Sequence, residues 1–178
     1  AVLLMEGSND LSFKDDVVTQ QALTNIRQML RTAKGLGVRP FLATVPPEVS
    51  GGYRAGGAPD VAAYNDRLRA LGPWDLIIDD GSHRQSHVLA TFEGLYDAVA
   101  PGGYYVIEDM HTSYWPRGYE GGPPGMDGTS VALIRGLLDG VNRRHAAREY
   151  PEEAAALTPV DAVHVFEKIA FLKRPEAG

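Results

Sequence analysis

Two pairs of adjacent carboxylates have the type and spacing that could do chemistry in this chain. Asp79-Asp80 directly follows the apolar run LII, and Glu108-Asp109 directly follows the run YYVI. If these runs are neighbouring parallel strands, the four carboxylates meet at one edge of a sheet and repel one another unless a proton or a cation neutralises them. Two interpretations stay open: a site for Mg²⁺, Mn²⁺ or Ca²⁺, and capping of the helices that follow.

Three further side chains lie close to these carboxylates in the sequence. His83 follows Asp80 by three residues, and an imidazole at the mouth of such a site is suited to act as a general base. His111 and Tyr114 follow the second carboxylate pair and are candidates to line a substrate pocket. His87 is interpreted as structural or solvent-facing, because no third imidazole or Glu at helical spacing completes a zinc site.

The segments that must position these residues alternate between strand and helix. Strands are predicted over residues 1–6, 38–45, 75–79 and 104–107, and residues 162–172 predict one long strand or a hairpin. Helices are predicted over residues 16–35, 61–71, 83–100 and 129–148 (the last capped by Asp127 or Thr129), with loops over 48–59 and 115–127. The alternation predicts an α/β fold, three-layered and doubly wound around a mostly parallel sheet, with residues 1–178 as a single domain.

Composition narrows the classes of function. The chain has 178 residues, of which 44% are apolar and 22% charged, as expected for a soluble globular domain. A net charge of -6 argues against a nucleic-acid partner. The absence of cysteine excludes disulfides, thiol nucleophiles and cysteine zinc sites. No apolar run is long enough to cross a membrane and no secretory leader is recognisable, so we expect a cytoplasmic protein with no membrane partner.

The segment from Trp74 to Pro116 is more informative about function than the composition is, because its sequence resembles that of a known family. It reads WDLIIDDGSHRQSHVLATFEGLYDAVAPGGYYVIEDMHTSYWP, and it resembles the magnesium-dependent sugar O-methyltransferases of macrolide biosynthesis. This is the mycinamicin and tylosin tailoring type of the class I S-adenosylmethionine (SAM)-dependent methyltransferases. The resemblance continues through GTSVALIRGLLDGV and VHVFEKIAFLKR, and so covers roughly residues 73–174. DDGSH followed by IEDxxTSYWP is its most specific part.

The resemblance implies a role for each matching residue. Asp80, Glu108 and Asp109 match the family's Mg²⁺ ligands, and His83 matches its general base. In that scheme the ion binds vicinal hydroxyls of a glycosylated small molecule and lowers the pKa of the hydroxyl to be methylated. His83 takes the proton, and the oxygen attacks the methyl group of SAM in line. Related enzymes tend to assemble, which makes a homo-oligomer a further implication.

The first 72 residues depart from the methyltransferase pattern. The family's acidic, Gly-rich turn after the first strand is replaced by EGSND, and the second strand ends in ATVPPE. Glu6, Gly7 and Asp79 are therefore the candidate cofactor-binding residues, and the missing Gly-rich motif predicts impaired methyl transfer.

Residues 1–72 instead resemble a fragment of the SGNH (GDSL-type) hydrolases, through VLLMEGSNDL, NIRQMLRTAKGLGVRPFLATVPP and YNDRLRAL. That resemblance implies an oxyanion hole with Asn9 and Gly7, but the block that carries the nucleophilic serine is not found. The chain is interpreted as a mosaic of a hydrolase-like half (1–72) and a methyltransferase-like half (73–178), of natural, engineered or computed origin. Three functions stay open: an O-methyltransferase, which is favoured, an ester hydrolase fragment without its nucleophile, and a catalytically silent metal-binding domain.

Overall fold

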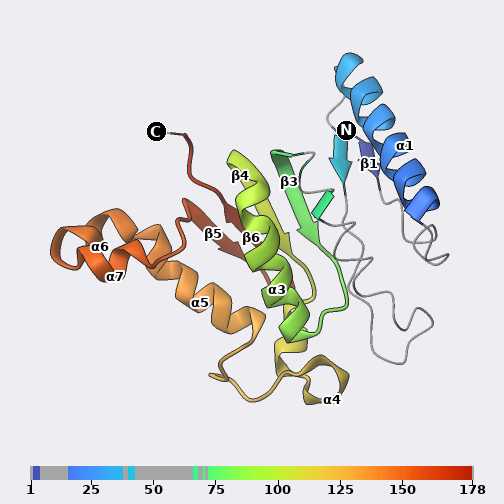
Figure 1. Cartoon of the computed structure of the whole chain (residues 1–178). Coiled ribbons are helices and arrows are strands. Elements are labelled where there is room, and N and C mark those ends of the chain that lie inside the picture. Colours follow the sequence, from blue (N-terminus) through green and yellow to red (C-terminus); the bar gives the residue numbers. More distant parts are fainter. Residues whose placement is uncertain are drawn as a thin grey trace.

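Strand and helix alternate along the chain, and the computed structural model has an α/β fold (Figure 1). The structure describes residues 2–4, 16–37, 40–42, 66–67, 70 and 72–177. The predicted loop over residues 48–59 lies outside this part of the chain, as does most of the helix predicted over 61–71.

The first unit consists of two parallel strands and the helix between them in sequence: β1 (Val2–Leu4), α1 (Asp16–Gly35) and β2 (Pro40–Leu42). Apolar side chains recur along α1 at a helical period, and Leu23, Ile26 and Leu30 are buried. The helix ends before Gly37, whose φ of 70° is readily adopted only by glycine. β2 also contacts β3 of the larger sheet, so this unit continues into the rest of the fold.

The larger sheet has the strand order β3-β4-β6-β5. Its members are β3 (Trp74–Asp79), β4 (Val99–Ile107), β5 (Ala162–Val165) and β6 (Ala170–Lys173). β3 and β4 are parallel, whereas β6 is antiparallel to both β4 and β5. The sheet is therefore mixed, which corrects the prediction of a mostly parallel one. The short connection between β5 and β6 is the reason, because only antiparallel neighbours can be joined so directly.

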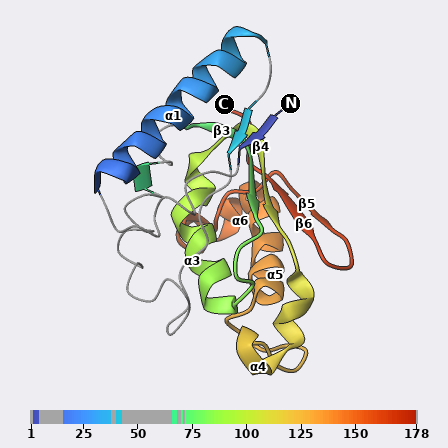
Figure 2. The same ribbon diagram turned by 90° about the vertical axis from the view of Figure 1, so that its right-hand side faces the viewer.

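The remaining helices follow β3 and β4. They are α3 (Gln85–Leu95), α4 (Pro116–Tyr119), α5 (Ser130–Val141), α6 (Arg143–Glu149) and α7 (Pro151–Ala155), with 3₁₀ turns η2 (Tyr96–Ala98) and η3 (Met110–Tyr114). Thr129 caps α5, because its Oγ1 accepts a hydrogen bond from the Ala132 amide. α3 contacts β3, α5 contacts β5, and the two helices contact each other, so they cover the same face of the sheet (Figures 1 and 2).

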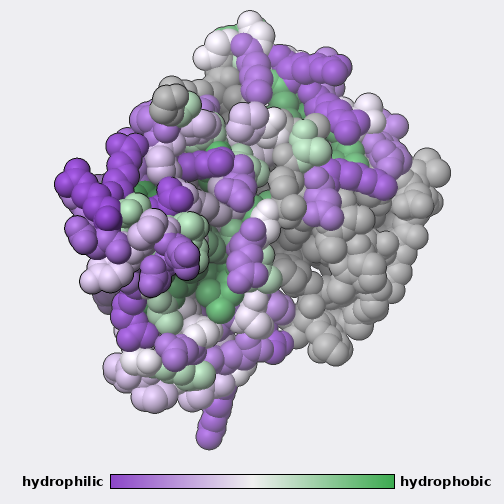
Figure 3. All heavy atoms as spheres, turned by 60° about the vertical axis from the view of Figure 1, so that its left-hand side comes forward, coloured by the Kyte–Doolittle hydropathy of each residue, from purple (hydrophilic) through white to green (hydrophobic). Residues whose placement is uncertain are grey.

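Three aromatic side chains join α3 and η2 to β4 of the sheet. The Phe92 ring lies 4.9 Å from that of Tyr96 and 5.5 Å from that of Tyr105, measured between centroids. Tyr105 is fully buried in β4, and this group forms the centre of a core that also contains the buried side chains of α1. Outside the core, hydrophilic residues cover most of the described surface on the side seen in Figure 3. No helix in the described part of the chain is long and apolar enough to cross a membrane.

Candidate active site at the carboxyl ends of β3 and β4

The two carboxylate pairs lie at the carboxyl ends of neighbouring parallel strands, as predicted. Asp79 pairs with Ile107 in the register of β3 and β4, so both strands end at the same edge of the sheet. The Glu108 amide then donates a hydrogen bond to the Asp79 carbonyl at 3.0 Å. Because parallel strands present their carboxyl ends to the same side, Asp80 and Asp109 emerge next to each other.

Imidazole groups lie beside the carboxylates. His83 Nε2 is 3.7 Å from Asp80 Oδ1 and 3.5 Å from Asp109 Oδ2, and His111 Nδ1 is 3.6 Å from Asp109 Oδ1. Burial raises the pKa of Glu108, and the negative charges of Asp80 and Asp109 raise it further, while His83 lowers it. These side chains therefore form one electrostatically coupled group.

The backbone at this site has an uncommon conformation. His83 has a φ of 57° and Asp109 a φ of 50°, both in the left-handed region. In the described part of the chain the only other non-glycine residue with a positive φ is Glu120, in the nearby loop. Asp and His enter this region more readily than most residues, but they persist there only when the surroundings hold them.

Asp79 lies deeper than the other carboxylates. It is 7% exposed, and burial raises its pKa to about 6, although hydrogen bonds from the Tyr105 hydroxyl and the Gly81 amide lower it. The Tyr105 hydroxyl lies 3.3 Å from Asp79 Oδ2. A Cβ at Gly81 would come within 3.1 Å of Asp79 Oδ1, so a glycine leaves room for this carboxylate.

A tether holds the loop after β4 against the start of α3. Glu120 accepts hydrogen bonds from the Arg84 guanidinium and, at 3.0 Å, from the Ser86 amide. Hydrogen bonds from Ser86 and Arg84 lower the pKa of Glu120 to about 2. No local sequence pattern indicates this pair, because the two residues are 36 positions apart.

The two predicted pocket residues, His111 and Tyr114, occupy different environments. His111 packs edge-on against Trp115 with ring centroids 4.5 Å apart, and Trp115 in turn contacts Tyr119 at 5.5 Å. His111 Nδ1 is buried without a hydrogen-bond partner. Tyr114 and Trp115 are each 47% exposed. The contacting rings of His111, Trp115 and Tyr119 therefore form an open rim beside Asp109 rather than a closed pocket.

His87 has a structural partner, in agreement with its interpretation as a structural residue. Its Nδ1 lies 2.7 Å from Ser82 Oγ. Burial lowers the pKa of His87, and the positive charge of Arg84 lowers it further.

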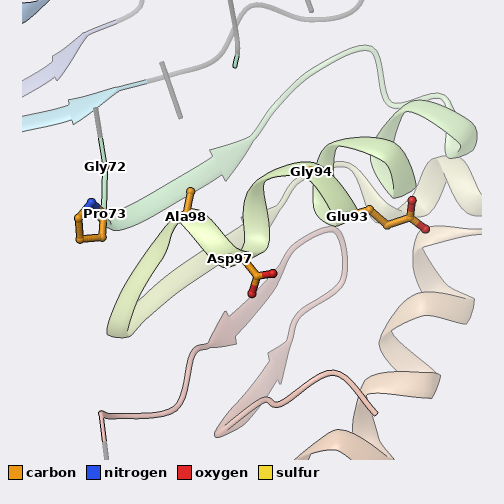
Figure 4. Close-up of a pocket in the computed structure, with 6 residues that line it drawn as sticks. All are labelled: Gly72, Pro73, Glu93, Gly94, Asp97 and Ala98. Atoms are coloured by element: carbon orange, nitrogen blue, oxygen red, sulfur yellow. The ribbon is translucent and has the colours of Figure 1, made fainter. Parts of the chain in front are cut away.

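A cavity of about 460 Å³ lies elsewhere, at the start of β3 and the end of α3 (Figure 4). It is lined by Gly72, Pro73, Glu93, Gly94, Asp97 and Ala98. Asp80 follows the opposite end of β3. The cavity is therefore separate from the carboxylates and imidazoles.

The donor chemistry of the site suits a hard cation, since carboxylate oxygens are the ligands that Mg²⁺ prefers. Burial raises the pKa of Glu108 most, and the repulsion from Asp80 and Asp109 that raises it further is what a bound cation would relieve. Among the described residues, however, no three acidic or imidazole side chains are arranged as a set that could hold a metal ion. Glu6, Gly7 and Asn9 lie outside the described residues, so the cofactor-binding and oxyanion assignments there stay predictions.

Comparison with known proteins gives a consistent group of relatives, although no family model matches the chain. Mycinamicin VI 2''-O-methyltransferase of Micromonospora griseorubida is 38% identical over 117 residues, which cover 64% of this chain and 29% of the relative. The 8-demethyl-8-alpha-L-rhamnosyl tetracenomycin-C 2'-O-methyltransferase of Streptomyces olivaceus is 40% identical over 125 residues (67% and 32%). Demethylmacrocin O-methyltransferase of Streptomyces fradiae is 36% identical over 121 residues (65% and 30%). The chain is similar to O-methyltransferases.

Solved structures give the same result. The MycE methyltransferase from the mycinamycin biosynthetic pathway, in complex with Mg and SAH, matches with a TM-score of 0.61 at 31% identity, over 78% of this chain and 37% of that chain. Its complex with Mg, SAH and mycinamycin VI matches with a TM-score of 0.59 at 32% identity, over the same shares. The chain spans about a third of the length of these relatives.

The similarity is not confined to the second half of the chain. Residues 73–178 are 106 of 178 residues, which is less than the 78% that the structural match covers, so the match includes residues before Pro73. The relatives described above are methyltransferases and none is a hydrolase. They therefore lend no support to the predicted SGNH-like half or to a mosaic origin.

Proposed function

We propose that this chain is the Mg²⁺- and SAM-dependent catalytic portion of an O-methyltransferase that acts on a sugar hydroxyl of a glycosylated, macrolide-type natural product. One observation carries the proposal: Asp80, Glu108, Asp109 and His83 lie together at the carboxyl edge of β3 and β4. The similarity to methyltransferases, one of them solved with Mg and SAH, supports the same interpretation.

Each site residue then has a role. Asp80, Glu108 and Asp109 are the residues that would hold Mg²⁺, and a bound ion would supply the positive charge that favours ionisation of a sugar hydroxyl. His83 accepts the proton of that hydroxyl at its imidazole. His111 and Tyr114 border the space in which the acceptor lies, and Trp115 extends this border with an apolar ring.

We assign Glu6 and Gly7, which follow β1 in the sequence, and Asp79, the last residue of β3, to SAM binding. A doubly wound arrangement, a single domain, a cytoplasmic location and assembly into homo-oligomers belong to the same proposal. Light scattering of the purified chain measures the oligomeric state directly.

Calorimetric titration of SAM into the purified chain tests the proposal, first with Mg²⁺ present and then with EDTA. We expect binding at one site with Mg²⁺, followed by methyl transfer to a glycosylated macrolide acceptor that EDTA abolishes. A folded protein that responds to Mg²⁺ but binds no SAM would contradict the methyl-transfer proposal and leave a catalytically silent metal-binding domain.

A further inference from the structure

A buried carboxamide next to the site uses its full hydrogen-bonding capacity. Gln85, at the start of α3, is 1% exposed. Its Nε2 donates to the His83 carbonyl at 3.1 Å and to Thr112 Oγ1 at 3.0 Å. Its Oε1 accepts from Ser113 Oγ at 3.1 Å and from the Ser130 amide at 2.7 Å. Two donors and two acceptors are all that a carboxamide offers.

The hydroxyl of Thr112 contacts both residues of the site that have a left-handed backbone, His83 and Asp109. Thr112 is 2% exposed, and its Oγ1 lies 3.1 Å from the His83 carbonyl and 2.8 Å from the Asp109 carbonyl. His83 and Asp109 are the two site residues with left-handed backbone, and their side chains approach to 3.5 Å. The Thr112 hydroxyl therefore lies between the main-chain carbonyls of His83 and Asp109, the two residues whose side chains approach each other.

We infer that Gln85 and Thr112 are positioning residues, which fix the backbone conformation of His83 and Asp109 and thereby the relative position of their side chains. The inference rests on the proposed function, because it concerns the base and a metal ligand of that site. Left-handed conformations of residues with a Cβ persist only where surrounding contacts over-determine them. In this site the contacts are the bonds that Gln85 and Thr112 make to the carbonyl of His83 and that Thr112 makes to the carbonyl of Asp109.

The network also fixes the site to the rest of the fold. Ser113 Oγ lies 2.7 Å from Ser130 Oγ and accepts at 3.3 Å from the Val131 amide. Gln85 thus joins the start of α3, the 3₁₀ turn η3 and the start of α5, three segments that are far apart in sequence. Apolar side chains could fill this volume at less desolvation cost, so a polar network here points to a need for defined orientation.

The test is the affinity of the full 178-residue chain for Mn²⁺, measured by calorimetry for the wild type, Thr112→Val and Thr112→Ser. Valine keeps the shape of threonine and removes the hydroxyl, whereas serine keeps the hydroxyl. We expect Thr112→Val to weaken Mn²⁺ binding by about tenfold or more, as loss of a group that orients metal ligands does. Thr112→Ser is expected to stay within about threefold of the wild type on the same scale.

A matched control lies on α3. Thr91 Oγ1 donates to the His87 carbonyl at 2.9 Å, within the helix and away from the carboxylates. Thr91→Val removes the same kind of hydrogen bond and should leave Mn²⁺ affinity unchanged. In the methyl-transfer assay, Thr112→Val should lower kcat with little change in the KM for SAM, since it changes orientation rather than cofactor contacts.

The outcomes separate this inference from the proposed function. Wild-type affinity in Thr112→Val, or equal losses in Thr112→Val and Thr112→Ser, would overturn the positioning role even if methyl transfer is observed. Mn²⁺ binding without methyl transfer would overturn the proposed activity and leave the comparison of variants valid, whereas no Mn²⁺ binding by the wild type would overturn both. If Thr112→Val does not fold, Gln85→Glu takes its place, because it keeps the acceptor and loses the Nε2 donor.

Discussion

Glu108 gives the most direct test at the scale of single residues. Burial and the charges of Asp80 and Asp109 raise its pKa, so a divalent cation competes with a proton for a crowded group of carboxylates. Glu108→Gln keeps the shape and removes the charge. We expect Mg²⁺ to raise the Tm of the wild type and to have no such effect on Glu108→Gln.

A control for this variant is Glu93→Gln, on the exposed face of α3 near the cavity at the other end of β3. It makes the same chemical change away from the site and should keep the full Mg²⁺ response. If Glu108→Gln responds to Mg²⁺ as the wild type does, Glu108 is not a ligand.

Asp79 predicts a pH dependence of folding stability. Its pKa rises from 3.8 to about 6 on folding, so the folded state binds its proton more tightly than the unfolded state does. The resulting stabilisation is complete below pH 3.8 and is lost as the pH rises through 6. An asparagine side chain carries no charge at any pH, and Asp79→Asn should therefore gain about 2–3 kcal/mol in free energy of unfolding relative to the wild type between about pH 4 and pH 7.5.

Urea denaturation of both proteins in EDTA at several pH values measures this difference, because the other titrating groups are common to the two chains. A constant difference between wild type and Asp79→Asn across this range would show that Asp79 titrates normally.

At the scale of elements, two glycines of α5 should respond oppositely to the same substitution. A Cβ at Gly136 meets nothing within 4 Å, whereas a Cβ at Gly140 would overlap the carbonyl of Thr158. Gly136→Ala should raise the free energy of unfolding by about 0.5–1 kcal/mol through helix propensity. Gly140→Ala should lower it by about 1–3 kcal/mol, because α5 must move away from its neighbour.

Each glycine variant is the control for the other, since both changes add one methyl group to one helix. Urea denaturation monitored by circular dichroism measures both. Equal effects in the two variants would mean that α5 does not pack closely against the segment that contains Thr158.

At the scale of the whole molecule, α1 and the larger sheet share one core. Leu23 of α1 is fully buried, and it belongs to the same buried cluster as Trp74 of β3. The proposed single domain should therefore unfold in one transition. We expect Leu23→Ala to cost about 2–5 kcal/mol and to shift the unfolding midpoint that Trp74 reports.

Fluorescence in a Trp115→Phe background isolates Trp74, because the chain has two tryptophans. Circular dichroism at a helix wavelength provides the second probe. If Leu23→Ala does not change the unfolding midpoint that Trp74 fluorescence reports, the single-domain proposal is contradicted. The result would mean that α1 and the larger sheet unfold independently.

Local sequence patterns predicted several elements and the place of the carboxylates and His83, whereas the helix predicted over 129–148 is divided into α5 and α6 and the strand predicted over 104–107 begins at Val99. The period of apolar residues predicted a helix over 16–35, which is the range of α1. Apolar runs that end in acidic pairs located the ends of β3 and β4, and Asp80, His83 and Asp109 do lie together there. These predictions succeed because they depend on local periodicity and on a general property of parallel strands.

The contacts that hold these residues include hydrogen bonds between segments far apart in the sequence. The Gln85–Thr112 hydrogen bond spans 27 residues and the Arg84–Glu120 pair spans 36, so no local pattern indicates either contact. Among the contacts to the two left-handed residues, the hydrogen bond from the Thr112 hydroxyl to the His83 carbonyl joins positions 29 residues apart. Local sequence sets the propensity of each segment, whereas hydrogen bonds between distant segments exist only after the chain has folded and excluded water from them.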